Sequence, residues 1–170
     1  MGSIMNIEQG NLIDLLENDE IDFLIHQTNC FQTIGKRSAS GIAKAIGEKY
    51  EPVVQADLSY QEGDINQLGK YLVIPVLTAS GKQKYIVNLY SQYLYGGMYG
   101  APTSYAAMRS GMKNLSNYLR KTYGTSIRIG TYWLGTSRGG ADINIVKPIM
   151  EKHLGIFKTV KIVELAPNKG

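Results

Sequence analysis

The sequence predicts an α/β protein in which helices cover both faces of a central sheet. Apolar stretches with the length of strands alternate along the chain with stretches whose apolar residues recur at helical spacing. The chain has 170 residues, which suits one domain with a sizeable core. The sequence shows no linker, internal repeat or low-complexity segment, so we expect residues 1–170 to form a single domain.

The expected strands lie at about residues 4–8, 23–27, 71–78, 84–90, 127–133 and 159–165. Pro75 has no amide hydrogen, which places the third strand at an edge of the sheet or at a bulge. A turn at Ser80-Gly81 is expected to join the third strand to the fourth. Proteins in which strands alternate with helices usually bind their ligands beyond the carboxyl ends of the strands, where loops lead into helices.

The expected helices include a short one at about residues 12–16 and a second over residues 40–50. A long helix with a methionine and leucine stripe is expected to be capped by Thr103 and to end just before Gly124. A last amphipathic helix, closed by Gly155, precedes the sixth strand.

The composition narrows the classes of function. The net charge is 18 − 14 = +4, but the basic residues are spread along the chain. A nucleic-acid surface usually needs clustered lysine and arginine, so a small anionic ligand or a solvated surface suits this charge better. Cys30 is the only cysteine, which excludes an internal disulfide. Only His26 and His153 could add imidazole ligands, and they are far apart in the sequence, so no metal and no cofactor are expected.

The location expected from the sequence is the cytoplasm, or the host cytoplasm if the protein is encoded by a phage. No apolar run approaches the ~20 residues that a membrane-spanning helix needs, and the start of the chain lacks a signal-peptide pattern. Residues 1–4 belong either to the natural chain or to a cloning remnant. A monomer is expected.

Two loops rich in small residues stand between a strand and a helix. The first is Gly35–Gly41, with the sequence GKRSASG, and the second is Gly130–Gly140, with the sequence GTYWLGTSRGG. Amides at the start of a helix lack intrahelical partners and carry the positive end of the helix dipole. Glycine and alanine let a phosphate approach such amides closely. Each loop is therefore either an ordinary turn or one half of a diphosphate site.

The order of these motifs resembles the macrodomain family, which binds ADP-ribose. The matching parts are HQTNC before the first loop, GIAKAI after it, VNLYSQYLYG, and IGTYWLG with GGADINIVKPIM, and the resemblance runs from Ile7 to about Leu165. It implies a three-layer α/β/α fold around a mixed, mostly parallel sheet of about six strands. More narrowly, the chain is similar to the ADP-ribose-1″-phosphate phosphatase-like branch, which includes many phage proteins.

The resemblance implies roles for particular residues. Asn11, followed by Leu12, stands where many macrodomains have an aspartate that accepts a hydrogen bond from the adenine amino group, and an amide oxygen can also accept there. Asn29 stands where the family has an asparagine beside the distal ribose. The first phosphate loop corresponds to Ser38, Ala39, Ser40, Gly41, Ile42 and Ala43. The second corresponds to Gly130, Thr131, Gly135, Thr136, Ser137, Arg138, Gly139 and Gly140.

The chain also departs from the family pattern. Lys36 and Arg37 belong to an apparent insertion in the first loop, and the second loop is lengthened at Thr136-Ser137-Arg138. Ile143 replaces the tryptophan that usually follows the aspartate of this branch. Gln92 stands where a related branch that cleaves ADP-ribose from proteins has a lysine, which argues against covalent lysine chemistry.

Hydrolysis at the distal ribose would need a group that orients or deprotonates a water. Asp142 and His26 are the candidates for this role, beside Asn29. Asp142 is either catalytic or a helix N-cap, and Pro148 favours a helix that starts near Asn144 and leaves Asp142 free. His26 is more often a hydrogen-bonded structural residue at such a position.

Other polar and aromatic residues have two open interpretations. Cys30 is more simply a packed residue than a nucleophile, because a thiol nucleophile needs an activating base. Lys36, Arg37 and Arg138 either reach a terminal phosphate or are exposed loop charges. Tyr132 and Trp133 are candidates for stacking on a base or ribose, with one of them facing the core. The segment from Tyr85 to Tyr105, with six tyrosines and three glycines, suits a mobile wall over a nucleotide.

The first functional hypothesis is a metal-free hydrolase that removes a group from the distal ribose of ADP-ribose, as an ADP-ribose-1″-phosphate phosphatase or in a related de-ADP-ribosylation. The alternative is a non-catalytic module that binds or sequesters ADP-ribose or a cyclic or modified relative, which the enlarged basic loop favours. RNA binding through the same surface is a third and weaker hypothesis.

Overall fold

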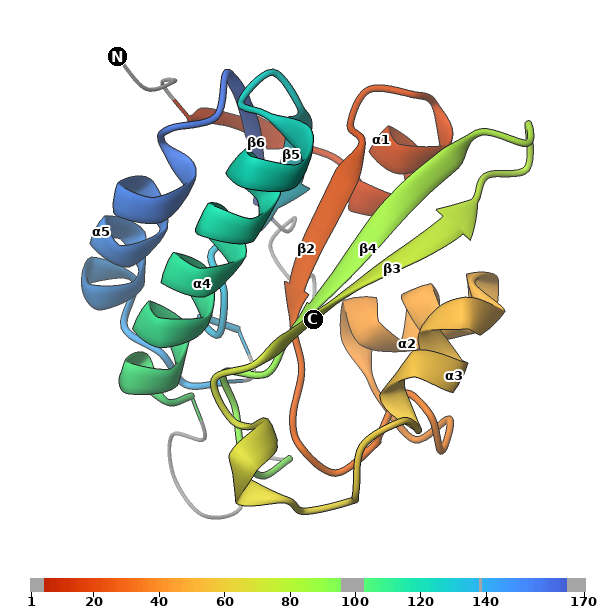
Figure 1. Ribbon diagram of the computed structural model, residues 1–170, viewed down its shortest axis with the longest axis vertical. Coiled ribbons are helices and arrows are strands. Elements are labelled where there is room, and N and C mark those ends of the chain that lie inside the picture. The colour runs from red at the N-terminus through yellow and green to blue at the C-terminus, as the bar shows by residue number, and fades with distance from the viewer. Residues whose placement is uncertain (1–4, 96–102, 138, 165–170) are drawn as a thin grey trace, which may run out of the picture.

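The computed structural model describes residues 5–95, 103–137 and 139–164. They form a six-stranded sheet with helices on both faces, which confirms the expected three-layer α/β/α fold (Figure 1). The strands are β1 (Asn6–Gln9), β2 (Phe23–Gln27), β3 (Tyr71–Leu77), β4 (Gln83–Leu89), β5 (Arg128–Thr131) and β6 (Thr159–Glu164). The helices are α1 (Leu12–Glu17), α2 (Gly41–Lys49), α3 (Glu51–Asp57), α4 (Tyr105–Tyr123) and α5 (Ile143–Leu154), with a 3₁₀ turn η1 at Ile65–Gln67.

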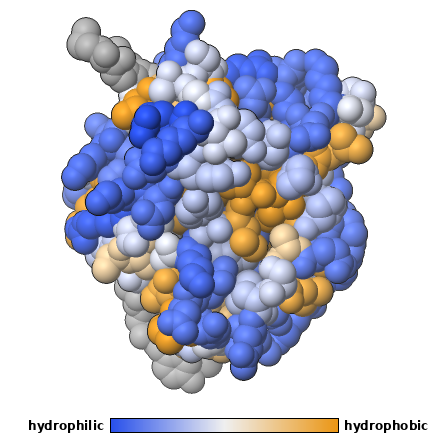
Figure 2. Space-filling view, viewed as in Figure 1, coloured by the Kyte–Doolittle hydropathy of each residue, from blue (hydrophilic) through white to orange (hydrophobic). Residues whose placement is uncertain are grey.

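The sheet is mixed and mostly parallel, as expected. Its strand order is β1-β6-β5-β2-β4-β3, and β3 is the strand that runs antiparallel to its neighbour β4. The turn between β3 and β4 includes Gly81 at φ +86, and the Gly81 amide donates to the Thr78 carbonyl at 2.9 Å. β3 is an edge strand, which confirms the inference from Pro75. Figure 2 shows hydrophobic residues along this edge within a largely hydrophilic face, and Leu77 is 66% exposed.

The two faces of the sheet support two separate cores. Along β2, Phe23 and Ile25 join the core beneath α4 and α5, whereas Leu24 joins the core beneath α1, α2 and α3. This alternation is the period-two pattern of a strand that is covered on both sides. Figure 1 shows α4 and α5 on one side of the sheet and α2 and α3 on the other. The carboxyl ends of the parallel strands are thereby held along one edge by packing on both faces.

Two local expectations are wrong. The N-cap of α4 is Ser104, whose hydroxyl accepts from the Ala107 amide at 3.1 Å, and Thr103 is instead turned toward Gln27, which donates to it at 3.1 Å. Helix α3 was not expected at all. It follows α2 after Tyr50 and has a proline in its first turn, where proline is tolerated because the missing amide hydrogen would have had no partner there.

No helix among the described residues is long and apolar enough to cross a membrane.

Candidate functional site

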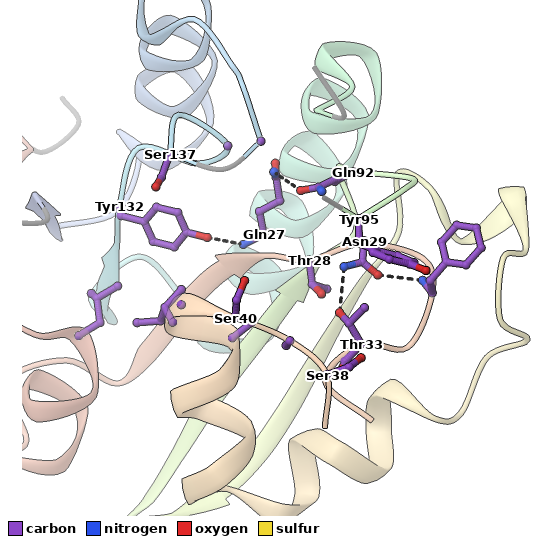
Figure 3. Close-up of a pocket in the computed structure, with 18 of the residues that line it drawn as sticks. Gln27, Thr28, Asn29, Thr33, Ser38, Ser40, Gln92, Tyr95, Tyr132 and Ser137 are labelled. Atoms are coloured by element: carbon purple, nitrogen blue, oxygen red, sulfur yellow. Dashed lines mark hydrogen bonds between the residues drawn. The ribbon is translucent and has the colours of Figure 1, made fainter. Parts of the chain in front are cut away.

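A cavity of about 920 Å³ lies along the carboxyl edge of the sheet. Residues that follow β1, β2 and β5 line it, together with the start of α2 (Figure 3). In the strand order, β1 and β6 lie at one end of the sheet and β2 and β4 lie toward the other. The cavity therefore runs across the carboxyl ends of several neighbouring strands. It therefore has a near end at β1 and β6, a middle between the two glycine loops, and a far end beyond β2.

The near end is mostly apolar, with one amide side chain. Leu12 and Val163 line it, and both are buried at 2% exposure. Asn11 caps α1, and its Oδ1 accepts from the amides of Ile13 at 2.9 Å and Asp14 at 3.3 Å. Backbone amides can only donate, so these contacts fix the oxygen toward the helix and leave Nδ2 on the other side. The expected acceptor for an adenine amino group is thus already engaged by the helix.

The middle of the cavity contains a helix start without a side-chain cap. Asn11, Ser104 and Asp142 cap α1, α4 and α5 with side-chain oxygens, but Ser40 makes no such bond at the start of α2. The next residue, Gly41, has a φ of +61, a left-handed conformation that favours glycine. Gly41 and the two residues after it line the cavity. First-turn amides are therefore available here for an anion.

The second loop faces α2 across the cavity, through Gly135, Ser137 and Gly139 (Figure 3). A Cβ atom at Gly135 would come within 2.5 Å of the Thr103 hydroxyl, and one at Gly139 within 2.3 Å. Gln27 donates to the same hydroxyl at 3.1 Å, so the loop packs closely against the polar side chains of Thr103 and Gln27 at the end of β2. Small residues are required here by packing as well as by any ligand.

The far end is polar and aromatic. The side chain of Asn29 is fixed, since its Nδ2 donates to the Thr33 hydroxyl at 2.9 Å and its Oδ1 accepts from the Phe31 amide at 3.0 Å (Figure 3). Lys36 forms an ion pair with Glu62, and both line the cavity. The inserted lysine of the first loop is therefore balanced by a carboxylate from the segment after α3.

Most of the expected ligand-binding residues come together in this cavity. Those that line it are Asn11, Leu12, Asn29, Lys36, Ser38, Ala39, Ser40, Gly41, Ile42, Ala43, Gly135, Ser137 and Gly139. They arise from three separate parts of the chain that the parallel sheet brings to one edge.

His26, one of the expected catalytic residues, does not face the cavity. It is fully buried, and its Nε2 lies 2.6 Å from Oδ1 of Asn88. Nδ2 of Asn88 donates to the Tyr90 hydroxyl at 3.3 Å, so the Asn88 oxygen faces His26 and Nε2 must carry the proton. Burial lowers the pKa of His26 to about 4. A neutral, enclosed imidazole of this kind is a structural residue and is not placed to activate a water.

Asp142 acts as a helix cap. Its Oδ1 accepts from the Asn144 amide at 2.9 Å, and its own amide donates to the Tyr105 hydroxyl at 3.0 Å. The start of α5 at Ile143 agrees with the expected start near Asn144, but the inference that Asp142 would then be free is wrong, because its side chain caps the helix. Asp142 is not among the residues that line the cavity.

Further expected residues of the second loop lie in the core or beside a smaller cavity. A Cβ at Gly130 would come within 2.4 Å of Ile21, so this glycine leaves room for the segment between α1 and β2. Thr131 is fully buried and donates to the Ile25 carbonyl at 2.8 Å. Trp133 is 6% exposed and packs in the core, and it borders a cavity of about 240 Å³ together with Thr136. Tyr132, its neighbour, lines the main cavity, as do the aromatic residues Phe31 and Tyr95.

Two further residues that were expected to bind the ligand do not line the cavity, and some expected residues lie outside the described ranges. Arg37 turns away from the cavity and pairs with Glu51 at 2.6 Å. Gly140 has a φ of +65 but does not line the cavity. Arg138 lies outside the described residues, as do Tyr99 and the three glycines of the tyrosine-rich segment.

Sequence reasoning missed several residues that line the cavity, among them Gln27, Thr28, Thr33 and Glu62. Gln27 and Thr28 had a signal, because polar residues end an otherwise apolar strand. Glu62 had none, since it meets Lys36 only through the tertiary fold. Cys30 is buried, and burial raises the pKa of its thiol to about 12, which agrees with a packing role.

Among the residues that the structure describes, no group of three or more histidine, cysteine, aspartate or glutamate side chains is placed to hold a metal ion.

Comparison with known proteins supports the fold. No protein-family model matches the sequence, and no curated protein matches it. The macrodomain of Mycobacterium tuberculosis DarG is similar in structure, with a TM-score of 0.70 and 19% identity over 96% of this chain and 99% of that one. The structure of Thermosipho africanus DarTG in complex with ADP-ribose has a TM-score of 0.70 and 16% identity, over 98% of this chain and 43% of that one.

A Trypanosoma brucei macrodomain in complex with ADP is more distant, with a TM-score of 0.57 and 14% identity over 95% of this chain and 64% of that one. At these identities the likeness concerns the fold. The chain has the α/β fold of a macrodomain, with a six-stranded mixed sheet.

Proposed function

We propose that the protein binds ADP-ribose or a close derivative of it in the cavity along the carboxyl edge of the sheet. The observation that carries this proposal is the uncapped start of α2, which faces the glycine loop at Gly135 and Gly139 across the middle of the cavity. Amides from a helix start suit a diphosphate. The apolar near end suits a base, and the polar far end suits a sugar.

Two of the structural neighbours agree with this choice of ligand. The Thermosipho africanus protein was solved with ADP-ribose, and the Trypanosoma brucei macrodomain with ADP. Their shared fold makes the same ligand class the first to test here.

The test is calorimetric titration with ADP-ribose, ADP and ribose 5-phosphate. ADP-ribose is expected to bind most tightly because it alone reaches all three parts of the cavity. Ribose 5-phosphate, which lacks the adenosine and one phosphate, is expected to bind weakly or not at all. Equal affinities for all three compounds, or no detectable binding of any of them, would contradict the proposal.

We extend the proposal to hydrolysis of a group on the distal ribose, as in the ADP-ribose-1″-phosphate phosphatase-like branch that the sequence resembles. What supports this step is that the fixed Asn29 and the carboxylate of Glu62 both line the cavity. A carboxylate there can orient an attacking water or accept its proton.

Phosphate release from ADP-ribose 1″-phosphate tests the hydrolysis. Glu62→Gln is expected to lower the rate more than Asp142→Ala, because Asp142 caps α5 whereas Glu62 lines the cavity. Tight binding with the nucleotide recovered intact would contradict the hydrolysis and would identify the protein as a binding module. A larger loss with Asp142→Ala would instead restore Asp142 as the catalytic carboxylate.

A further inference from the structure

The far end of the cavity is built on a buried carboxylate that the proposed function does not use directly. Asp57, the last residue of α3, is fully buried. Its Oδ2 accepts from the Gly35 amide at 2.9 Å, and its Oδ1 accepts from the Tyr90 hydroxyl at 2.8 Å. Burial raises the pKa of Asp57, although the bond from the Gly35 backbone opposes this effect. A carboxyl group is rarely enclosed unless such partners fix it.

Tyr60 links this carboxylate to the segment that carries Asn29. Its hydroxyl accepts from the Gln32 amide at 2.9 Å. The single proton of that hydroxyl is within reach of the Asn29 carbonyl at 3.2 Å and of Asp57 Oδ1 at 3.3 Å. One hydroxyl therefore holds the backbone on both sides of Phe31, which places the side chain of Asn29.

The segment held in this way is strained and needs external support. Gln32 and Arg37 have φ values of +56 and +58, a left-handed conformation that costs non-glycine residues about 1 kcal/mol or more. A Cβ at Gly35 would come within 2.5 Å of the Leu58 side chain, so the first loop also lies directly on the end of α3. The inserted residues are thus seated on residues 57–62.

We infer that Asp57 and Tyr60 are positioning residues that set the specificity of the cavity for the distal sugar. Neither residue lines the cavity. Through Asn29, Gln32 and Gly35 they fix the backbone that forms the far end, whereas their hydrogen bonds within the described residues reach neither the near end nor the start of α2. This inference rests on the proposed function, because it assigns the far end to the second ribose of ADP-ribose.

The test compares ADP-ribose with ADP, which lacks the distal ribose, in calorimetric titrations of the wild type and of Tyr60→Phe. Phenylalanine keeps the ring that packs edge-on against Tyr90 at 5.1 Å and removes only the hydroxyl. The preference for ADP-ribose over ADP is expected to fall about five- to tenfold, with the affinity for ADP unchanged. Asp57→Asn, which puts donors toward the two tyrosine hydroxyls, is expected to lower the preference at least as much.

Asp22→Asn is the matched control, because Asp22 lies at the opposite edge of the sheet, where it binds Arg128 and Lys84. It is expected to lower the melting temperature but to keep the wild-type preference. A loss of preference in this control equal to that in Tyr60→Phe would overturn the inference, since stability alone would then explain the effect. Wild-type preference in both Tyr60→Phe and Asp57→Asn would also overturn it.

Failure of the inference can be told apart from failure of the proposed function. If the wild type binds neither nucleotide, the proposed function fails and the inference fails with it. If the wild type binds both nucleotides equally, the cavity takes the nucleotide but its far end does not recognise the sugar. That result overturns the inference alone.

Discussion

Polar side chains gather at both ends of the parallel strands, which we call the amino edge and the carboxyl edge of the sheet. Their interactions differ between these two edges. At the amino edge, Asp19 and Asp22 pair with Lys82, Lys84 and Arg128 at distances of 2.5 to 2.9 Å. At the carboxyl edge, glycine loops surround a cavity, and α2 begins there without a side-chain cap. Charges are satisfied within the protein at the first edge, while donors remain available at the second. The first edge therefore serves stability, and the second is where we propose that the ligand binds.

Asp22→Ala is expected to have the largest effect on stability. Asp22 accepts from Arg128 Nε at 3.0 Å and from Lys84 Nζ at 2.9 Å, and the Lys84 side chain is only 5% exposed. Removing the carboxylate leaves a nearly buried ammonium with Asp19 as its remaining carboxylate, at a cost of about 2–4 kcal/mol. Urea unfolding measures this loss. The affinity of the folded variant for ADP-ribose is expected to stay unchanged, and a parallel loss of binding would break the division between the edges.

The amino edge also predicts acid sensitivity. Bonds from Lys82, Lys84 and Arg128 hold the pKa of Asp19 well below its usual value. Burial would raise the pKa of Asp22, but bonds from Arg128 and Lys84 lower it more. Their folded-state pKa values lie below those of the unfolded chain, so their stabilising contribution is complete above about pH 4 and is lost as the pH falls further.

The free energy of unfolding, measured between pH 6 and pH 2.5, should therefore fall steeply below pH 4. Asp22→Asn should flatten this slope, because one of the two titrating carboxylates is absent. A slope identical to that of the wild type would assign the acid sensitivity to other groups.

A pair of glycines tests the two edges with nearly equal backbone strain. Gly41 at φ +61 and Gly81 at φ +86 both have open space where a Cβ would lie. Gly41 starts α2 at the cavity, and Gly81 is in the turn that leads into β4 at the amino edge. Alanine at either position should cost about 1–2 kcal/mol of stability through the left-handed conformation.

The two variants should differ in binding. Gly41→Ala is expected to weaken ADP-ribose at least about tenfold, because the methyl group and the shifted backbone disturb the amides that face the phosphates. Gly81→Ala should bind as the wild type does. Calorimetry and urea unfolding on both proteins check this, and equal binding by both variants would remove the start of α2 from the site.

The sequence predicted the fold and much of the carboxyl edge because these depend on local patterns. Strand-length apolar runs located all six strands, and small residues before a helix located the loop at Ser40 and Gly41. The direction in which a single side chain points, toward the cavity or toward the core, was harder to predict. Every residue of β2 is buried, so alternation could not tell whether His26 would turn to the cavity. Pro148 indicated the start of α5 to within one residue, but it could not tell whether Asp142 would cap the helix or face the cavity.

The far end of the cavity was the least predictable part. Asp57, Tyr60 and Glu62 belong to a helix and a loop that gave no functional pattern, and they approach the first loop only after both have packed. The Lys36 insertion was recognised as unusual from the sequence, but its partner Glu62 lies 26 residues further along the chain. Contacts of this kind depend on tertiary structure and leave no local signature.

The smallest predicted effect concerns the near end, at Asn11. The Asn11 oxygen is engaged by the amides of Ile13 and Asp14, so it is poorly placed to accept from an adenine amino group as well. Asn11→Asp keeps one oxygen as the cap of α1, where a negative charge is favourable, and gives a second oxygen to the cavity. ADP-ribose should then bind about two- to fivefold more tightly. The inosine analogue, whose 6-oxo group cannot donate, should gain nothing in calorimetry, and an equal gain for both nucleotides would place the base elsewhere than beside Asn11.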